Sequence, residues 1–147
     1  MGKSSQSNSN KMLTSQLERY FQNKSDVVAI YLFGSYALGK ECDRSDIDIG
    51  IVFDGTDRQF MMEKRTAYML ELSRILRKDL HIVILNFATE QLMSQIFEKG
   101  KCVVVNDMKK LTQFKMVAFA KIADFAYYLR QMQSGFIKTI MGTQSSG

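Results

Sequence analysis

The sequence has very few residues of the kinds that most metal and nucleophile sites require. It contains one histidine, His81, and two cysteines, Cys42 and Cys102, whose spacing does not indicate a pair. Zinc sites and Ser-His-Asp or Cys-His catalytic groups would all depend on His81, so the sequence argues against these classes of site. We expect both cysteines to be reduced thiols, as is usual in a cytoplasmic protein.

The sequence also lacks segments that would direct it to or across a membrane. No apolar run approaches the length of about 20 residues that a membrane span needs, and the N-terminus is rich in Ser and Asn, without an apolar signal core. We therefore expect a cytoplasmic protein. The net charge of +5 is dispersed along the chain without long basic tracts, so a direct role in nucleic-acid binding is not favoured.

Apolar patterns predict strands and helices in alternation. Short apolar runs predict strands at residues 27–33, 46–53, 80–85 and 102–105. Apolar residues at helical spacing predict helices at 12–21, 57–78 and 89–99 and from 107 to 132 or beyond, with a short helix at 36–39. The link between the first two strands is too short for a parallel crossover, which favours an antiparallel or mixed sheet.

This order of elements indicates one α/β (α+β) domain, in which a small mixed β-sheet is flanked by helices and followed by a long C-terminal helix. The length of 147 residues suits a single apolar core. We expect the domain to span residues 11–135. A disordered tail at 1–10 would precede it, and a helix end and flexible tail at 136–147 would follow it.

The most informative segment runs from Gly34 to Asp48. It begins with Gly34-Ser35 after a buried strand and ends with Asp46-Ile47-Asp48 at the start of the next strand. A Gly-Ser turn can offer backbone N–H groups and a hydroxyl to phosphate oxygens. Carboxylates two residues apart on a strand point to the same side, and such hard oxygen ligands suit Mg²⁺. The segment therefore predicts a phosphate-binding turn at Gly34 and Ser35 beside a metal site at Asp46 and Asp48.

The same segment also fits the Walker A pattern G-x-x-x-x-G-K, from Gly34 to Lys40. Two features argue against that interpretation. Glu41 follows where Mg²⁺ binding requires Ser or Thr, and the residues after it lead into a strand, whereas a Walker A loop opens a long helix. Lys40 and Arg44 could reach a bound phosphate, although a solvated position suits each of them equally well.

The segment from Gly34 to Asp48 resembles the motif of the nucleotidyltransferase superfamily related to DNA polymerase beta. The residues that carry this resemblance are Gly34-Ser35, Ala37, Gly39, Ser45-Asp46, Ile47 and Asp48. The short chain is similar to the minimal nucleotidyltransferases, or MNT proteins. Segments 80–88 and 95–104 extend this resemblance, and segment 122–125 is similar to MntA-type antitoxins. The resemblance implies a nucleotidyltransferase fold that uses ATP and Mg²⁺. It also implies an antitoxin that transfers AMP onto a tyrosine of its partner, a HEPN-fold RNase toxin of the HepT type.

Two other functions stay open. An MNT protein without catalytic activity could neutralise its toxin by binding alone, and a related nucleotidyltransferase could modify a small molecule. The complete motif of Gly34, Ser35, Asp46 and Asp48 argues for catalysis. The length of the chain argues against the small-molecule enzymes, which usually need a larger second domain for the acceptor.

The sequence departs from the family pattern at a third carboxylate, which the family places near the start of the third strand. Our alignment puts His81 at that position, and Asp79 lies two residues earlier on the same strand face. Three interpretations follow. Asp79 is the third ligand in a shifted register, His81 is a ligand or a general base, or neither takes part and the activity is weak or lost.

A heptad-like series of apolar residues runs along the last helix. Steps of three and four residues join Leu111, Phe114, Ala118, Ile122, Phe125, Leu129 and Met132. Packing of the helix on the domain's own sheet would explain this series, and so would an exposed part of an interface with the toxin.

Overall fold

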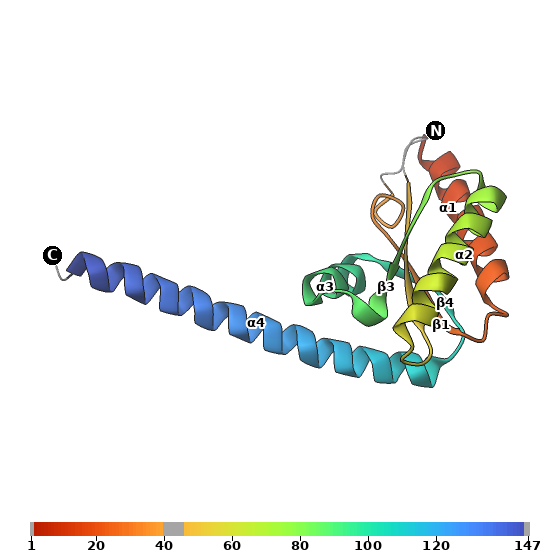
Figure 1. The fold of residues 1–147 in the computed structure, drawn as a ribbon. Coiled ribbons are helices and arrows are strands. Elements are labelled where there is room, and N and C mark those ends of the chain that lie inside the picture. The colour runs from red at the N-terminus through yellow and green to blue at the C-terminus, as the bar shows by residue number, and fades with distance from the viewer. Residues whose placement is uncertain (1, 40–45, 146–147) are drawn as a thin grey trace.

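The computed structural model describes residues 2–39 and 46–145, and its centre is a four-stranded β-sheet flanked by helices (Figure 1). The strands are β1 (Val27–Phe33), β2 (Ile47–Phe53), β3 (Leu80–Ile84) and β4 (Lys101–Val105). The helices are α1 (Gly2–Phe21), α2 (Arg58–Leu76), α3 (Glu90–Lys99) and α4 (Met108–Ser145), and a 3-10 turn, η1, covers Leu85–Phe87.

The sheet is mixed, as the sequence predicts. The strand order is β3-β2-β1-β4, with β1 antiparallel to both β2 and β4 and with β2 parallel to β3. The short link after β1 returns the chain in the antiparallel direction, whereas α2 supplies the crossover that a parallel pair needs. β1 and β2 occupy the centre and are buried along almost their whole length, which explains their continuous apolar sequences.

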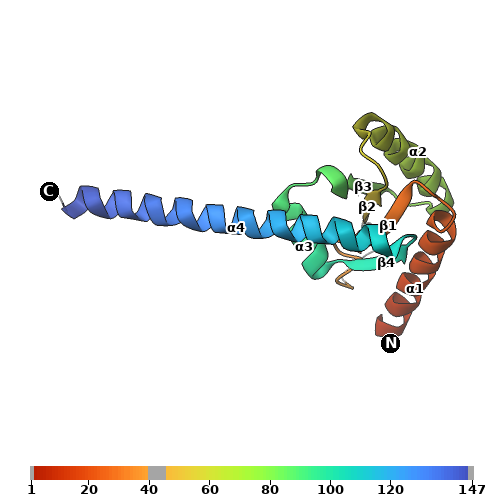
Figure 2. The ribbon, with the colours of Figure 1, turned by 90° about the horizontal axis from the view of Figure 1, so that it is seen from below.

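The helices cover the two faces of the sheet in separate groups (Figure 2). α1 and α2 lie on one face, where Leu17 and Leu72 share an apolar core with Ile49. α3 and the first turns of α4 lie on the other face, where Ile96 and Leu111 belong to a second core. Because successive strand residues point to opposite faces, neighbours along β2 have different surroundings.

Several expected boundaries are wrong. α1 begins at Gly2, so residues 2–10 are helical where we expected a disordered tail. α4 continues to Ser145, so the helix end expected after residue 135 takes up most of the segment in which we also expected a flexible tail. Each segment extends a helix whose other half packs in the core, and elongation of a formed helix costs little where no proline intervenes. Residues 36–39 form hydrogen-bonded turns in place of a short helix, with Gly39 at φ 68°.

The 38-residue helix α4 extends well beyond the rest of the molecule (Figure 1). It begins at Met108, directly after Asp107, whose carboxylate accepts a hydrogen bond of 3.0 Å from the backbone N–H of Lys110 and so caps the helix. Neither α4 nor any other helix in the described part of the chain has an apolar stretch of the length that a bilayer requires.

Tyr68 connects α2 to the apolar core and to the residue that precedes β1. Its ring packs edge-on against Tyr20 and Phe21, and its hydroxyl donates a hydrogen bond of 2.5 Å to the Asp26 carboxylate. Burial raises the pKa of Tyr68, and the hydrogen bond to Asp26 raises that pKa further. The folded protein therefore favours the protonated phenol.

We expect the free energy of unfolding to fall as the pH rises through about 10, partly because of Tyr68. In the unfolded chain this phenol loses its proton near pH 10, whereas in the folded protein it stays protonated there. The folded state then binds more protons than the unfolded state, so stability declines with pH. Urea titrations between about pH 9 and about pH 11 should show a smaller decline for Tyr68→Phe than for the wild type. The exposed Tyr127→Phe should behave like the wild type, and an unchanged decline in Tyr68→Phe would contradict the assignment.

Candidate active site

Asp46 and Asp48 lie at the start of β2, on the face opposite the α1–α2 core. Ile47 and Ile49 point into that core, so the strand alternation turns Asp48 to the other face. The two carboxylates are close enough for the charge of Asp46 to raise the pKa of Asp48. The structure therefore brings together the pair that the sequence assigns to a metal site.

His81 lies beside Asp48 on the neighbouring strand. The parallel register of β2 and β3 pairs Asp48 with His81, and Nδ1 of His81 is 3.5 Å from Oδ1 of Asp48. The His81 side chain is 69% exposed, whereas that of Asp48 is 26% exposed. A molecule that approaches this edge of the sheet can therefore reach the imidazole directly.

Asp79 contributes its backbone rather than its carboxylate to the contacts seen here. Its carbonyl oxygen accepts a hydrogen bond of 3.0 Å from the backbone N–H of Ile47, which fixes the start of β3 against β2. Its carboxylate is not among the groups that shift the pKa of Asp48. Within residues 2–39 and 46–145, no three His, Cys, Asp or Glu side chains converge so as to hold a metal ion.

Electrostatics at Asp48 favour a bound cation. Burial raises the pKa of Asp48 most, His81 lowers that pKa, and Asp46 raises it. A half-buried carboxylate next to a second carboxylate is costly to ionise unless a positive charge compensates. Carboxylate oxygens are ligands that Mg²⁺ prefers, so the donor set of Asp46 and Asp48 fits that ion.

The turn after β1 packs directly against the Asp48 carboxylate. Phe33, the last residue of β1, is paired with Asp48, and Gly34 follows at φ 72°. A Cβ atom at Gly34 would collide with Oδ2 of Asp48, so any other residue would force that carboxylate to move, and the positive φ favours glycine as well. Ser35 is the next residue and is half-buried. Gly34 and Ser35, predicted to bind phosphate, thus lie beside the predicted metal ligands.

A contact between Tyr36 and Lys78 supports the same turn and was missed by sequence reasoning. Nζ of Lys78 donates a hydrogen bond of 2.5 Å to the hydroxyl of Tyr36, and the carbonyl oxygen of Tyr36 accepts one of 3.5 Å from the amide of Asn10. These contacts link the turn to α1 and to the loop before β3. No local pattern could indicate them, because Tyr36 and Lys78 are 42 residues apart in the sequence.

Part of the predicted site lies outside the described residues, namely Lys40, Arg44 and Ser45, and so does Cys42, which we expected to be a reduced thiol. The structure nevertheless supports the rejection of a Walker A loop. Residues 34–39 form turns and β2 begins at Ile47, which leaves no room for the long helix that such a loop opens.

Comparisons with known proteins address the fold and the family. The family model described as Polymerase beta, Nucleotidyltransferase matches residues 15–109, a range that contains every candidate site residue named above except Asn10. No curated protein matches the sequence.

Solved structures of toxin-antitoxin complexes share the fold. A toxin-antitoxin structure with AMP-PNP aligns with a TM-score of 0.64 and 24% identity, over 87% of this chain and 98% of that chain. A mutant of the MntA-HpeT toxin-antitoxin pair aligns with a TM-score of 0.58 and 26% identity, over 90% and 97% of the two chains. A structure of tri-AMPylated Shewanella oneidensis HEPN toxin in complex with MNT antitoxin aligns with a TM-score of 0.59 and 21% identity, over 90% of this chain and 98% of that chain.

We expect Gly34→Ala to destabilise the protein more than Gly39→Ala. Both glycines have positive φ, so alanine is strained by about 1–2 kcal/mol at either position. Among the described residues, the new Cβ meets a neighbour only at Gly34, namely the Asp48 carboxylate, which should add about 1 kcal/mol or more. Free energies of unfolding from urea titrations measure the difference.

A double-mutant cycle tests the origin of this difference. In an Asp48→Ala background the carboxylate is absent, so Gly34→Ala should lower the free energy of unfolding by no more than Gly39→Ala does. Equal losses for the two glycine variants in the wild-type background would show that the close approach to Asp48 is not the constraint.

Proposed function

Because the chain belongs to the polymerase beta nucleotidyltransferase family, we propose that it is an antitoxin that transfers AMP from ATP onto a tyrosine of a HEPN-fold toxin. The observation that carries the proposal is the packing of Gly34 against Asp48, with Asp46 beside it. This arrangement puts a phosphate-binding turn next to a pair of hard ligands, which is what a metal-bound triphosphate requires. The toxin complexes that share the fold, one with AMP-PNP and one with a tri-AMPylated toxin, support the choice of donor and acceptor.

In the proposed reaction the phenolic oxygen of the toxin tyrosine attacks the α-phosphorus of ATP. A bond forms from that oxygen to the α-phosphorus, the bond to the bridging oxygen of the β-phosphate breaks, and pyrophosphate leaves. Gly34 admits the triphosphate close to the backbone, and Ser35 offers its N–H and hydroxyl to the phosphate oxygens. Asp46 and Asp48 would hold Mg²⁺, which neutralises phosphate charge. Positioning and electrostatic complementarity then account for most of the rate.

We further propose that His81 accepts the phenolic proton. A neutral imidazole is a capable base near neutral pH, and His81 is exposed at the edge of the site, where a partner's tyrosine can reach it. Its contact with Asp48 would orient the ring and stabilise the imidazolium that forms. Asp79 has no such contact with Asp48 and is assigned a backbone role in joining β2 to β3.

Neutralisation by binding alone is the second candidate. One observation favours it: the residue beside Asp48 on β3 is a histidine, where the resemblance implies a carboxylate. A site with only two acidic ligands would hold a metal ion more weakly, and slow or absent chemistry would leave binding as the means of neutralisation.

We expect radioactive label from α-labelled ATP to appear on the toxin when the two proteins are incubated with Mg²⁺. Asp46→Asn/Asp48→Asn should reduce the rate of labelling by at least about 100-fold, because the charges that bind the metal are removed. Gel filtration should show that this variant still binds the toxin. Labelling at the wild-type rate in the double variant would contradict the metal site, and tight binding without label in the wild type would favour the second candidate.

His81→Asn and Asp79→Asn separate the interpretations of the third position. If His81 is the base, His81→Asn should lower kcat by about 100-fold or more, and raising the pH should restore part of the rate as the phenol ionises by itself. Asp79→Asn should keep kcat within about threefold of the wild type, since the backbone contact survives. A loss in Asp79→Asn as large as in Asp46→Asn would instead make Asp79 the third ligand.

A further inference from the structure

The outer part of α4 carries an apolar stripe that neither core of the protein uses. We name as the outer stripe the residues Ile122, Phe125, Leu129, Met132 and Phe136, which follow one another at steps of three or four residues. None of them belongs to either apolar core of the described structure. The segment from Lys121 to Ser145 is roughly 38 Å long at about 1.5 Å per residue. It projects away from the domain in both ribbon views (Figures 1 and 2).

The outer stripe continues a face of α4 that is already an internal interface. About one and three turns before Ile122 on the same face, Ala118 and Leu111 are buried, and Phe114 packs against Phe97 of α3. The heptad-like series therefore has two parts. Packing on the domain explains it up to Ala118, and beyond that point the same apolar face extends past the end of the domain.

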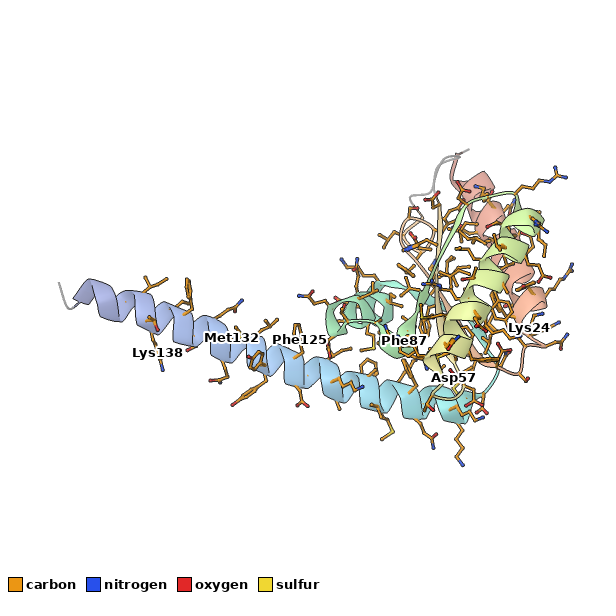
Figure 3. All side chains as sticks on the ribbon, viewed as in Figure 1. Lys24, Asp57, Phe87, Phe125, Met132 and Lys138 are labelled. Carbon is orange, nitrogen blue, oxygen red and sulfur yellow. The ribbon has the colours of Figure 1, made fainter. Side chains whose placement is uncertain are left out.

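The outer stripe faces the side of the molecule on which the candidate active site lies. In Figure 3, Phe125 projects from the side of α4 on which α3 lies, and Lys138 projects from the opposite side. α3 packs on the sheet face that also carries Asp48. A globular partner that rests on the outer stripe would therefore occupy the angle between α4 and the domain, on the same side as Asp48 and His81.

Charge on α4 distinguishes between possible partners. The helix contains six Lys or Arg residues and one Asp, so its net charge is +5, which equals the net charge of the whole chain. The remaining residues, with 14 basic and 14 acidic side chains, are balanced. Three of the six basic residues, Lys121, Arg130 and Lys138, lie on the outer segment (121–145), which with Asp124 has a net charge of +2. Two copies of this segment side by side would bring like charges together, whereas a partner with an acidic rim around an apolar surface would complement them.

We propose that the outer stripe is the docking surface for the toxin. A toxin bound there would have one of its tyrosines close to Asp48 and His81. This rests on the proposed function for the identity of the partner. The stripe lies beyond residue 109, where the match to the nucleotidyltransferase family ends, so the surface is separate from the part that the family shares. Docking along α4 would add a surface for the acceptor outside the part of the chain that the family shares.

The test compares two charge-introducing double variants on the same helix. Met132→Lys/Phe136→Lys alters the outer stripe at side chains that are 54% and 68% exposed. Met116→Lys/Tyr127→Lys is the matched control, since its side chains are 68% and 60% exposed and lie off the stripe. Neither change touches the candidate active site, and thermal unfolding should show that both variants stay folded.

We expect the stripe variant to raise the KM for the toxin at least about tenfold while the KM for ATP stays unchanged, because apolar anchors dominate such interfaces. The control variant should have the same KM for the toxin and the same KM for ATP as the wild type. Calorimetry without ATP should show that the wild type binds the toxin more weakly as the salt concentration rises. This is the result expected if the toxin has an acidic rim.

Three other outcomes are decisive. Equal KM values for the toxin in both variants would overturn the docking surface. A homodimer of this chain would also overturn it, if light scattering shows the dimer for the wild type and the control but a monomer for the stripe variant. The outer stripe would then bind a second copy of the chain and not the toxin. If the wild type binds the toxin through the stripe but never labels it, docking stands and the proposed AMP transfer fails.

Discussion

The close approach of the Gly34 backbone to the Asp48 carboxylate is the constraint on which the site depends. Antiparallel pairing places Phe33 opposite Asp48, so the chain must leave β1 beside that carboxylate. A side chain at position 34 would fill the space that Oδ2 of Asp48 occupies. With glycine there, the turn's N–H groups and the acidic pair lie side by side, which suits a ligand that carries both phosphate and a metal ion. The fold thus builds the site from backbone approach as much as from side chains.

The core on the far face of the sheet keeps this geometry in register. Ile47, Ile49 and Ile51 are fully buried against α1 and α2, and the acidic residues alternate with them along β2. A slip of one residue would exchange the two sets, burying the carboxylates against α1 and α2 and moving the isoleucines to the other face of the sheet. The apolar energy of the core therefore also fixes where Asp46 and Asp48 point. Asp48 tolerates partial burial on this strand at the cost of a raised pKa, a cost that a bound cation would reduce.

The sequence was sufficient for the features that depend on local pattern. Strand alternation predicted that Asp46 and Asp48 share a face, and the short link after β1 predicted the mixed sheet, which is confirmed. The contact of His81 with Asp48 needed the parallel register of β2 with β3, which no local pattern specifies. The bond from Lys78 to Tyr36 joins residues far apart in the sequence. The start of α1 was missed because polar residues continue a helix that its docked half has already formed.

The candidate active site and the proposed docking surface lie in different parts of the chain. The family match ends at residue 109, and α4 begins at Met108, so the candidate catalytic residues and the outer stripe fall in different parts of the sequence. The local charge follows the same division, since α4 accounts for the whole net charge. If the outer stripe docks the toxin as proposed, a substitution there would weaken the partner's binding without moving Gly34 or Asp48. A substitution in the turn would in the same way affect the proposed phosphate site and leave the outer stripe unaltered. The same nucleotide site could then serve different acceptors, because specificity would depend on a helix outside the candidate active site.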